Sequence, residues 1–234
     1  MEGTENTFRF VWDKQQTMVK STVLGRPAAE LRQMLPFPPP LTGLVLAGGQ
    51  GCRLGKNKAL LEWEGEPLVR LIARRLQTVC ERVLVVTPFA EVAAAAGVPA
   101  VKDEPPDSGP LGGLWAGLQA AETEYCAVTA CDLPFFNPEL VAYLATLAAG
   151  YEAVVPYVNG SWQPLPALYA RTCAKVAEEL LAQRKLALRA LLDQVRVRQV
   201  DEAELRRLDP ELTSFRNLNT WEDYRRWTGG TTGG

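Results

Sequence analysis

The stretch LAGGQGCRLGKNK, from Leu46 to Lys58, carries residues suited to phosphate chemistry. Its glycines allow backbone N–H groups to come close to phosphate oxygens. Arg53 can offer an anion two parallel hydrogen bonds, and Lys58 can offer a single positive charge. The stretch therefore indicates a site for a phosphorylated ligand, although a tight turn alone would also account for the glycines.

Two familiar phosphate loops fit this stretch poorly. A Walker A loop follows the pattern G-x-x-x-x-G-K-[ST], but the spacing from Gly49 to Gly55 is one residue too long and Asn57 stands at the hydroxyl position. A dinucleotide-binding loop requires a glycine where Leu54 stands, and it opens directly into a helix. Residues 58–68 instead predict a strand, a Glu-Gly turn and a short return strand. We therefore expect neither a P-loop protein nor a Rossmann dehydrogenase.

The composition excludes several further classes of chemistry. The chain of 234 residues has no histidine, which excludes histidine-dependent nucleophilic catalysis and imidazole-bound zinc. Its net charge of −2 provides no basic excess for binding nucleic acid. A hydrophobic content of 47% is enough for a core. The remaining chemistry would use carboxylates, lysine, arginine, backbone N–H groups or a hard metal ion.

The cysteines and the apolar runs indicate where the protein works. The chain has five cysteines, an odd number, and no CxxC pair, which is typical of unpaired thiols in a reducing compartment. No apolar run is long enough for a transmembrane helix, and the first residues do not follow the order of a secretory signal. We expect a cytoplasmic protein with no membrane partner.

From residue 41 onward, apolar strands alternate with amphipathic helices. Strands are expected at 41–47, 82–87, 98–103, 125–131, 152–158, 165–170 and 195–200, and helices at 67–80, 90–97, 113–123, 137–150, 172–183, 186–193 and 220–227. This alternation predicts an α/β fold with a mostly parallel sheet covered on both faces. Ligands bind beyond the carboxyl ends of the strands in such sheets. The candidate site therefore lies in the loops that follow Ala47, Thr87, Lys102 and Cys131.

The chain divides into three parts by composition. Residues 1–40 form an N-terminal extension in which FRFVW and PAAELRQML suggest a short strand and a short helix. This extension ends in the stiff, proline-rich linker 36–40. Residues 41–228 carry the alternating pattern and form the main domain, and residues 229–234 form a flexible Gly/Thr tail.

Five segments resemble the motifs of one enzyme family, in the family's order. LAGGQGCRLGKNKALL resembles the nucleotidyltransferase signature L-A-G-G-x-x-x-R-[ML]-G-x-x-K. The other four matching segments are SGPLGGLWAGL, ACDLPFF, QPLPALY and FRNLNTWEDY. Together they resemble the molybdenum cofactor guanylyltransferases and their MobA-like relatives over residues 42–226. The resemblance implies a three-layer α/β/α, Rossmann-like nucleotidyltransferase fold.

The same resemblance implies a reaction and a cofactor. The family transfers GMP from GTP to the terminal phosphate of molybdopterin with Mg²⁺ and releases pyrophosphate. Arg53 and Lys58 would neutralise the triphosphate, and Asp132 would hold the metal. The nucleotide would also contact the backbone or side chains of Leu46, Ala47, Gly48, Gly49, Asp103 and Gly109. Asn217 and Asn219 would line the side where the pterin phosphate arrives, and a molybdoenzyme or its chaperone is the expected recipient.

One departure from the family pattern keeps alternatives open. Related guanylyltransferases often carry a base-reading asparagine just after the second main strand, where this chain has Thr87 and Pro88. A cytidylyltransferase, or an enzyme acting on another acceptor such as a sugar phosphate, therefore stays an alternative. A non-catalytic nucleotide-binding or cofactor-delivery protein is less expected, because Arg53, Lys58 and Asp132 are all present. Three tryptophans are expected to serve packing: Trp162, Trp221 and Trp227.

Overall fold

A computed structural model describes residues 39–49, 57–103 and 108–228. The predicted N-terminal extension up to residue 38, the tail 229–234, Cys52 and Arg53 lie outside these ranges. The strands of the central sheet are β1 (Leu41–Leu46), β4 (Arg82–Val86), β5 (Ala100–Val101), β6 (Tyr125–Ala130), β7 (Ala153–Val158), β8 (Ser161–Trp162), β9 (Ala167–Ala170) and β10 (Val197–Asp201). Their order is β10-β7-β9-β6-β1-β4-β5, with β8 beside β7.

The sheet is mostly parallel, as predicted. β1 runs parallel to both β4 and β6, and β4 runs parallel to β5. β9 lies antiparallel between β6 and β7, while β10 is parallel to β7. Strands buried on both faces read as continuous apolar runs, and β1, β4 and β6 do so.

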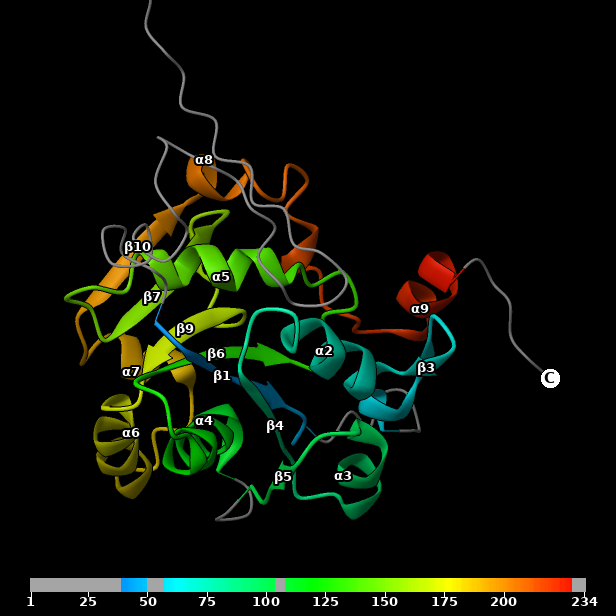
Figure 1. The fold of residues 1–234 in the computed structure, drawn as a ribbon, viewed down its shortest axis with the longest axis horizontal. Helices are drawn as coiled ribbons and strands as arrows, with labels where there is room; N and C mark the ends of the chain where they lie inside the picture. The colour runs from blue at the N-terminus through cyan, green and yellow to red at the C-terminus, as the bar shows by residue number, and fades with distance from the viewer. Residues whose placement is uncertain (1–38, 50–56, 104–107, 229–234) are drawn as a thin grey trace, which may run out of the picture. The chain divides into compact units, whose positions relative to one another are not determined.

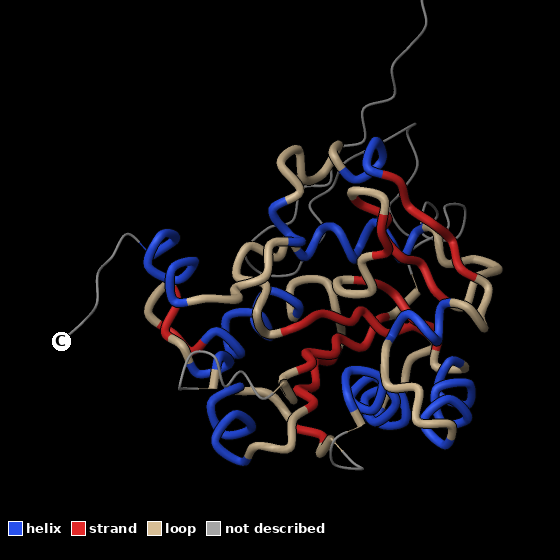
Figure 2. The backbone as a smooth tube through the Cα atoms, turned by 180° about the vertical axis from the view of Figure 1, so that it is seen from behind, coloured by secondary structure: helices blue, strands red, loops and turns tan. Residues whose placement is uncertain are grey.

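Helices cover both faces of the sheet, and the sheet lies between two apolar cores. α2 (Leu68–Leu76), α3 (Ala90–Ala96) and α5 (Pro138–Thr146) contribute to one core. α4 (Gly109–Ala120), α6 (Cys173–Ala182) and α7 (Leu188–Leu192) contribute to the other. α5 and α4 lie on opposite sides of the sheet in Figure 1, and Figure 2 shows the red strands between blue helices from behind. The three-layer α/β/α prediction is confirmed.

Smaller elements complete the described residues. A short 3-10 helix, η2 (Lys58–Leu60), precedes the antiparallel hairpin of β2 (Glu62–Trp63) and β3 (Glu66–Pro67). The predicted Glu-Gly turn joins these strands, with positive φ angles at Glu64 and Gly65. Near the C-terminus come α8 (Glu202–Leu205), η3 (Thr213–Phe215) and α9 (Trp221–Thr228).

Several predicted boundaries are wrong, and α2, for example, ends at Leu76 instead of residue 80. α4 begins at Gly109 instead of residue 113, because Pro110 has a fixed φ that suits the first turn of a helix. α5 ends at Thr146, before the predicted stop at Gly150, which adopts a positive φ in the following turn. β5 covers only Ala100–Val101 of the predicted strand 98–103, since its register with β4 extends over those two residues.

Asp209 holds the turn before η3, and its titration gives a stability test. Its buried carboxylate accepts hydrogen bonds from Ser214 N at 2.8 Å and from Thr213 N and Oγ1 at 3.0 and 3.1 Å. Burial raises the pKa of Asp209, but the hydrogen bonds from Ser214 and Thr213 outweigh it and hold the pKa below its usual value. A depressed folded pKa stabilises the fold above the unfolded value of about 3.9, and this stability is lost as pH falls through the folded pKa.

We therefore expect Asp209→Asn to lower the thermal unfolding midpoint at pH 7 by about 3–8 °C, since hydrogen bonds to a charged group are lost. The difference from the wild-type protein should shrink as pH falls toward 3. Calorimetric scans of both proteins from pH 3 to pH 7 would measure it. A difference that stays constant over this range would contradict the assignment of the stabilisation to the ionised carboxylate.

Candidate functional site

Four loops leave the sheet at its carboxyl edge. Leu46 at the end of β1 pairs with Val86 of β4 and with Ala130 of β6. Val86 in turn pairs with Val101 of β5. The chain therefore leaves these four strands at one level, and the loops after Ala47, Thr87, Lys102 and Cys131 begin at the same edge, as the sequence predicts.

The first residues of the glycine-rich loop are fixed by the sheet. Ala47 donates its N–H to the Val86 carbonyl at 2.8 Å, and its own carbonyl accepts the hydroxyl of Thr87 at 2.9 Å. The Leu46 carbonyl accepts the N–H of Cys131 at 3.1 Å. Because the Ala47 N–H is engaged in this way, backbone donors for a phosphate must come from Gly48 onward. The predicted cation Arg53 lies outside the described residues.

Asp103 lies directly against Gly48. A Cβ atom on Gly48 would lie 2.4 Å from Asp103 Oδ2, so any larger residue there would displace the carboxylate. Asp103 Oδ1 accepts a hydrogen bond from the buried Ser108 hydroxyl at 3.3 Å. Burial raises the pKa of Asp103, and the Ser108 hydrogen bond partly offsets this. This pair places an acidic acceptor beside the backbone that would carry the nucleotide.

Pro88 lies at the same place. Its Cδ atom is 3.5 Å from the position that a Cβ on Gly48 would take. The preceding Thr87 is buried, and its hydroxyl also accepts the N–H of Phe89 at 3.2 Å. An apolar ring therefore stands beside Gly48 and Asp103, at the position where the resemblance leads us to expect a base-reading asparagine.

A second cluster brings together Lys58, Asp132 and Asn219. Lys58 Nζ is 3.7 Å from Asp132 Oδ2 and donates a hydrogen bond to Asn219 Oδ1 at 3.4 Å. The three side chains come from distant parts of the chain, and Lys58 and Asn219 are 161 positions apart. The sequence predicts all three in one site, and in the structure Lys58 contacts each of the other two.

Local structure holds each member of this cluster. Asn57 caps η2 by accepting the N–H of Ala59 at 3.1 Å, which orients Lys58 at the start of that turn. Asp132 follows β6, and its carbonyl accepts the N–H of Leu218 at 2.8 Å. Leu218 is fully buried, so the segment that carries Asn219 is anchored beside Asp132.

The Lys58–Asp132 pair is only partly accessible to water. The exposed fractions of the two side chains are 17% and 25%. Burial raises the pKa of Asp132, while the Lys58 ammonium acts to lower it. In such a pair the carboxylate can bind a metal ion, and the neighbouring ammonium can bind an anionic phosphate at the same site.

Comparisons with known proteins identify the family of this chain. The sequence model of the MobA-like NTP transferase domain matches residues 43–201. The chain belongs to the MobA-like NTP transferase family. A probable molybdenum cofactor guanylyltransferase of Pelotomaculum thermopropionicum is 37% identical over 182 residues, which cover 78% of this chain and 89% of that protein.

Two other MobA-like proteins extend the comparison. The molybdenum cofactor guanylyltransferase of Desulfosudis oleivorans is 34% identical and covers 80% of this chain and 93% of its own. The crystal structure of molybdopterin-guanine dinucleotide biosynthesis protein A from Archaeoglobus fulgidus superimposes with a TM-score of 0.70 at 26% identity, covering 80% of this chain and 96% of that one. This MobA-like chain is thus a nucleotidyltransferase.

The donor set around Asp132 suits a metal ion that is shared with a substrate. Within residues 39–49, 57–103 and 108–228, no three histidine, cysteine, aspartate or glutamate side chains form a group that could hold a metal. A closed cage of protein ligands therefore does not fit the described residues. A hard cation held by one or two carboxylates and by substrate phosphates does fit them.

No helix among the same residues is long and apolar enough to cross a membrane.

Two predicted site residues, Gly109 and Asn217, take no part in the hydrogen bonds and the ion pair that Asp103, Lys58 and Asp132 make within the described residues. Gly109 has a φ of +63°, and a Cβ there would lie 3.0 Å from the Leu186 Cβ and 3.1 Å from the Leu186 carbonyl oxygen. This close packing explains the glycine without a ligand, so its part in nucleotide binding stays a prediction. Asn217 is exposed beside the buried Leu218, and its predicted contact with the pterin phosphate also stays a prediction.

Sequence reasoning missed an aromatic cluster that joins the same three segments as the Lys58 cluster. Trp63 makes edge contacts with Phe135 and Tyr224 at ring-centroid distances of 5.6 and 6.1 Å, and Trp227 contacts Phe135 at 5.2 Å. Trp162 and Trp221 also contact aromatic rings, and the expectation that the three tryptophans serve packing stays a prediction. The signal for the cluster was an aromatic residue within a few positions of each of Lys58, Asp132 and Asn219.

Proposed function

We propose that this MobA-like enzyme transfers GMP from GTP to the terminal phosphate of molybdopterin, with Mg²⁺ as its metal. The observation that carries the proposal is the contact of Lys58, Asp132 and Asn219 at the carboxyl edge of the sheet. The names of the relatives from Pelotomaculum thermopropionicum and Desulfosudis oleivorans support the molybdenum cofactor as acceptor and a guanine nucleotide as donor.

The reaction is a displacement at the α-phosphorus of GTP. An oxygen of the molybdopterin phosphate forms a bond to this phosphorus. The bond from the phosphorus to the bridging oxygen breaks, and pyrophosphate leaves with the electron pair. Because the attacking oxygen is already anionic, the reaction requires no strong general base, and a chain without histidine can perform it.

The described residues supply charge and alignment for this step. Lys58 would neutralise the oxygens of the triphosphate as negative charge develops on the leaving pyrophosphate. Asn219, held against Lys58 at 3.4 Å, would orient the incoming phosphate by hydrogen bonding. Gly48 and Gly49 would offer backbone N–H groups, and Asp103 would accept a hydrogen bond from the ribose or the base. The Asp132 carboxylate would hold Mg²⁺, which when bound supplies positive charge to the phosphate oxygens.

One observation favours a second candidate, a cytidylyltransferase of the same fold. Pro88 stands beside Gly48 and Asp103, and its ring offers no hydrogen bond to guanine. A base held in this place would be recognised by backbone groups or by Asp103. The names of the relatives still favour GTP as the nucleotide.

The same proposal includes a cytoplasmic location and delivery to a molybdoenzyme or its chaperone. The four cysteines in the described part of the chain are free thiols, and three of them are buried. Burial raises the pKa of the Cys80 and Cys126 thiols to about 12, which keeps them protonated and unreactive. Such thiols support a reducing compartment.

A nucleotide screen tests the proposed function. The protein is incubated with Mg²⁺, molybdopterin and each of the four ribonucleoside triphosphates, and pyrophosphate is measured. We expect release with GTP alone, because the guanylyltransferase relatives share most of the chain. Release with CTP alone would select the cytidylyltransferase, and no release with any nucleotide would favour a binding or delivery protein. Reactions without Mg²⁺ and without molybdopterin serve as controls.

A further inference from the structure

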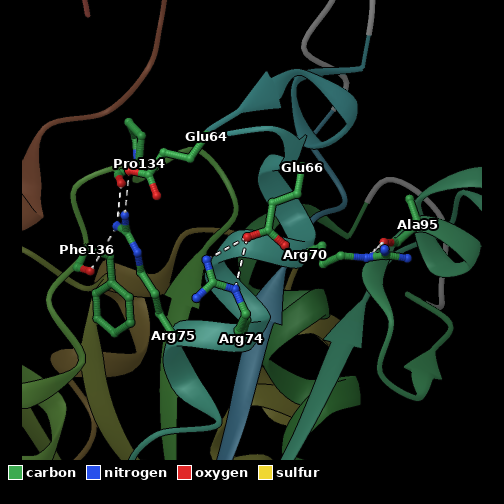
Figure 3. A network of polar contacts seen from close by, with 8 residues as sticks. All are labelled: Glu64, Glu66, Arg70, Arg74, Arg75, Ala95, Pro134 and Phe136. Carbon is green, nitrogen blue, oxygen red and sulfur yellow. Dashed lines mark hydrogen bonds and ion pairs between the residues drawn. The ribbon is translucent and has the colours of Figure 1, made fainter. Parts of the chain in front are cut away.

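Arg75, in the last turn of α2, binds the loop that follows Asp132. Its Nη1 atom donates hydrogen bonds to the carbonyl oxygens of Pro134 and Phe136 at 2.5 and 3.3 Å. Its Nη2 atom pairs with Glu64 Oε1 at 3.2 Å. Figure 3 shows the guanidinium between these partners. One half-buried side chain therefore joins the Asp132 loop to the β2–β3 turn.

The two segments that Arg75 joins carry the two charged members of the Lys58 cluster. Asp132 lies two positions before Pro134, and Lys58 lies at the start of η2, just before the hairpin that contains Glu64. The hairpin is closed at its base by the hydrogen bond from Leu68 N to the Leu61 carbonyl at 2.9 Å. Movement of either segment would change the distance between Lys58 Nζ and Asp132 Oδ2.

Other contacts of the Asp132 loop engage other atoms than the Pro134 and Phe136 carbonyls. Phe135 packs edge-on against Trp63 of the hairpin, and the Phe136 N–H donates to the Leu133 carbonyl at 3.0 Å. Leu133 and Phe136 are buried, which anchors their side chains in the core. The N–H of Leu218 engages only the carbonyl of Asp132 itself. The carbonyls of Pro134 and Phe136 accept from a guanidinium, and a planar group with several fixed donors can orient both of them.

The neighbouring arginines of α2 provide a contrast. Arg74 donates to Glu66 Oε1 through Nε at 3.0 Å and Nη2 at 2.6 Å, and its side chain is 59% exposed. Arg70 donates to the Ala95 carbonyl at 3.0 Å. Figure 3 shows Arg74 bonded to Glu66 and Arg70 bonded to Ala95. These contacts stay within α2, the hairpin and α3, so neither arginine supports the Asp132 loop.

We infer that Arg75 is a positioning residue for nucleotidyl transfer: it holds Asp132 at the distance from Lys58 that lets both bind one metal–triphosphate complex. The inference rests on the proposed function for the identity of the ligand. Removal of a group that orients a metal ligand typically weakens metal binding by about 10- to 100-fold. Loss of Arg75 should therefore weaken metal binding even under conditions where the variant is fully folded.

The test measures Mn²⁺ as a paramagnetic substitute for Mg²⁺. Binding of Mn²⁺ to the full-length protein is followed by electron paramagnetic resonance in the presence of non-hydrolysable GTP. Arg75→Met should weaken Mn²⁺ binding by about tenfold, and Arg75→Lys by a smaller factor, because lysine keeps the charge but not the planar donors. The matched control Arg74→Met removes the same charge from the same turn and should stay within about twofold of wild type.

The measurement is made well below the unfolding midpoint of each variant. A purely structural role for Arg75 would lower that midpoint without changing Mn²⁺ binding, and this outcome would overturn the inference. Equal weakening by Arg74→Met would also overturn it, because the effect would then follow from charge alone. If Arg75→Met does not fold, Arg75→Lys decides the question: unchanged Mn²⁺ binding in that variant would refute the role of the planar donors.

This test is separable from the proposed function. Mn²⁺ binding requires no molybdopterin, so it can be measured with whichever of GTP and CTP binds, even if no pyrophosphate is released. Wild-type turnover with unchanged Mn²⁺ binding in Arg75→Met would leave the proposed function standing and reject only the role of Arg75.

Discussion

Asp132→Asn should reduce nucleotidyl transfer by about a hundredfold or more while the protein keeps its fold. Groups that only support a metal ligand already contribute about 10- to 100-fold, so loss of the ligand's own charge should cost at least as much. The side chain is three-quarters buried beside Lys58, and asparagine preserves its size. The loop should therefore keep its shape, since its backbone is held by Leu218 and Arg75.

The rate is measured as pyrophosphate release at saturating GTP and molybdopterin over a range of Mg²⁺ concentrations. Asp193→Asn, which makes the same change at an exposed position at the end of α7, serves as the control and should leave the rate unchanged. Turnover of Asp132→Asn within about twofold of wild type, at all Mg²⁺ concentrations, would show that another group holds the metal.

The fold was predictable because its strands are buried on both faces. The apolar runs at β1, β4 and β6 have no polar face, and only a sheet covered by helices on both sides accommodates them. Boundaries were less predictable where a residue suits two states. Gly109 and Pro110 read as part of a loop, but proline also fits the first turn of a helix, and α4 begins there.

The residues of the candidate site could be proposed from the sequence, but the distances between them could not. Lys58 and Asp132 stand out because charged residues directly follow or border apolar segments. Their 3.7 Å separation depends on contacts between segments far apart in the sequence, such as the hydrogen bond from Leu218 N to the Asp132 carbonyl. Local sequence patterns do not report such contacts, since they reflect the period of one element at a time.

The role inferred for Arg75 was also not predictable from local sequence patterns. In the sequence it is one of two adjacent arginines in an amphipathic helix, and residue type alone does not distinguish them. Only the structure separates them: Arg74 pairs with Glu66 on an exposed surface, whereas Arg75 reaches the carbonyls of the Asp132 loop. A supporting residue is recognised by what it touches, because its type and spacing are those of an ordinary helix surface.

Lys58→Ala should weaken binding of a nucleoside triphosphate by roughly 10- to 100-fold, which corresponds to the loss of one charge-assisted hydrogen bond. Its pH dependence should also change. Burial raises the pKa of the Asp132 carboxyl and Lys58 acts to lower it, so removal of the ammonium should raise this pKa further. Metal binding requires the ionised carboxylate, and protonation would therefore abolish it at a higher pH in the variant than in the wild-type protein.

Isothermal titration with non-hydrolysable GTP and Mg²⁺, from pH 5 to pH 8, measures both effects. Lys175→Ala on α6 removes an exposed lysine far along the chain and should leave the binding curve and its pH dependence unchanged. If Lys58→Ala bound nucleotide as tightly as wild type at pH 8 but more weakly at pH 6, Lys58 would act only through the ionisation of Asp132. Weaker binding at every pH, together with an acid limb moved to higher pH, requires both the direct contact with the triphosphate and the support of the Asp132 charge.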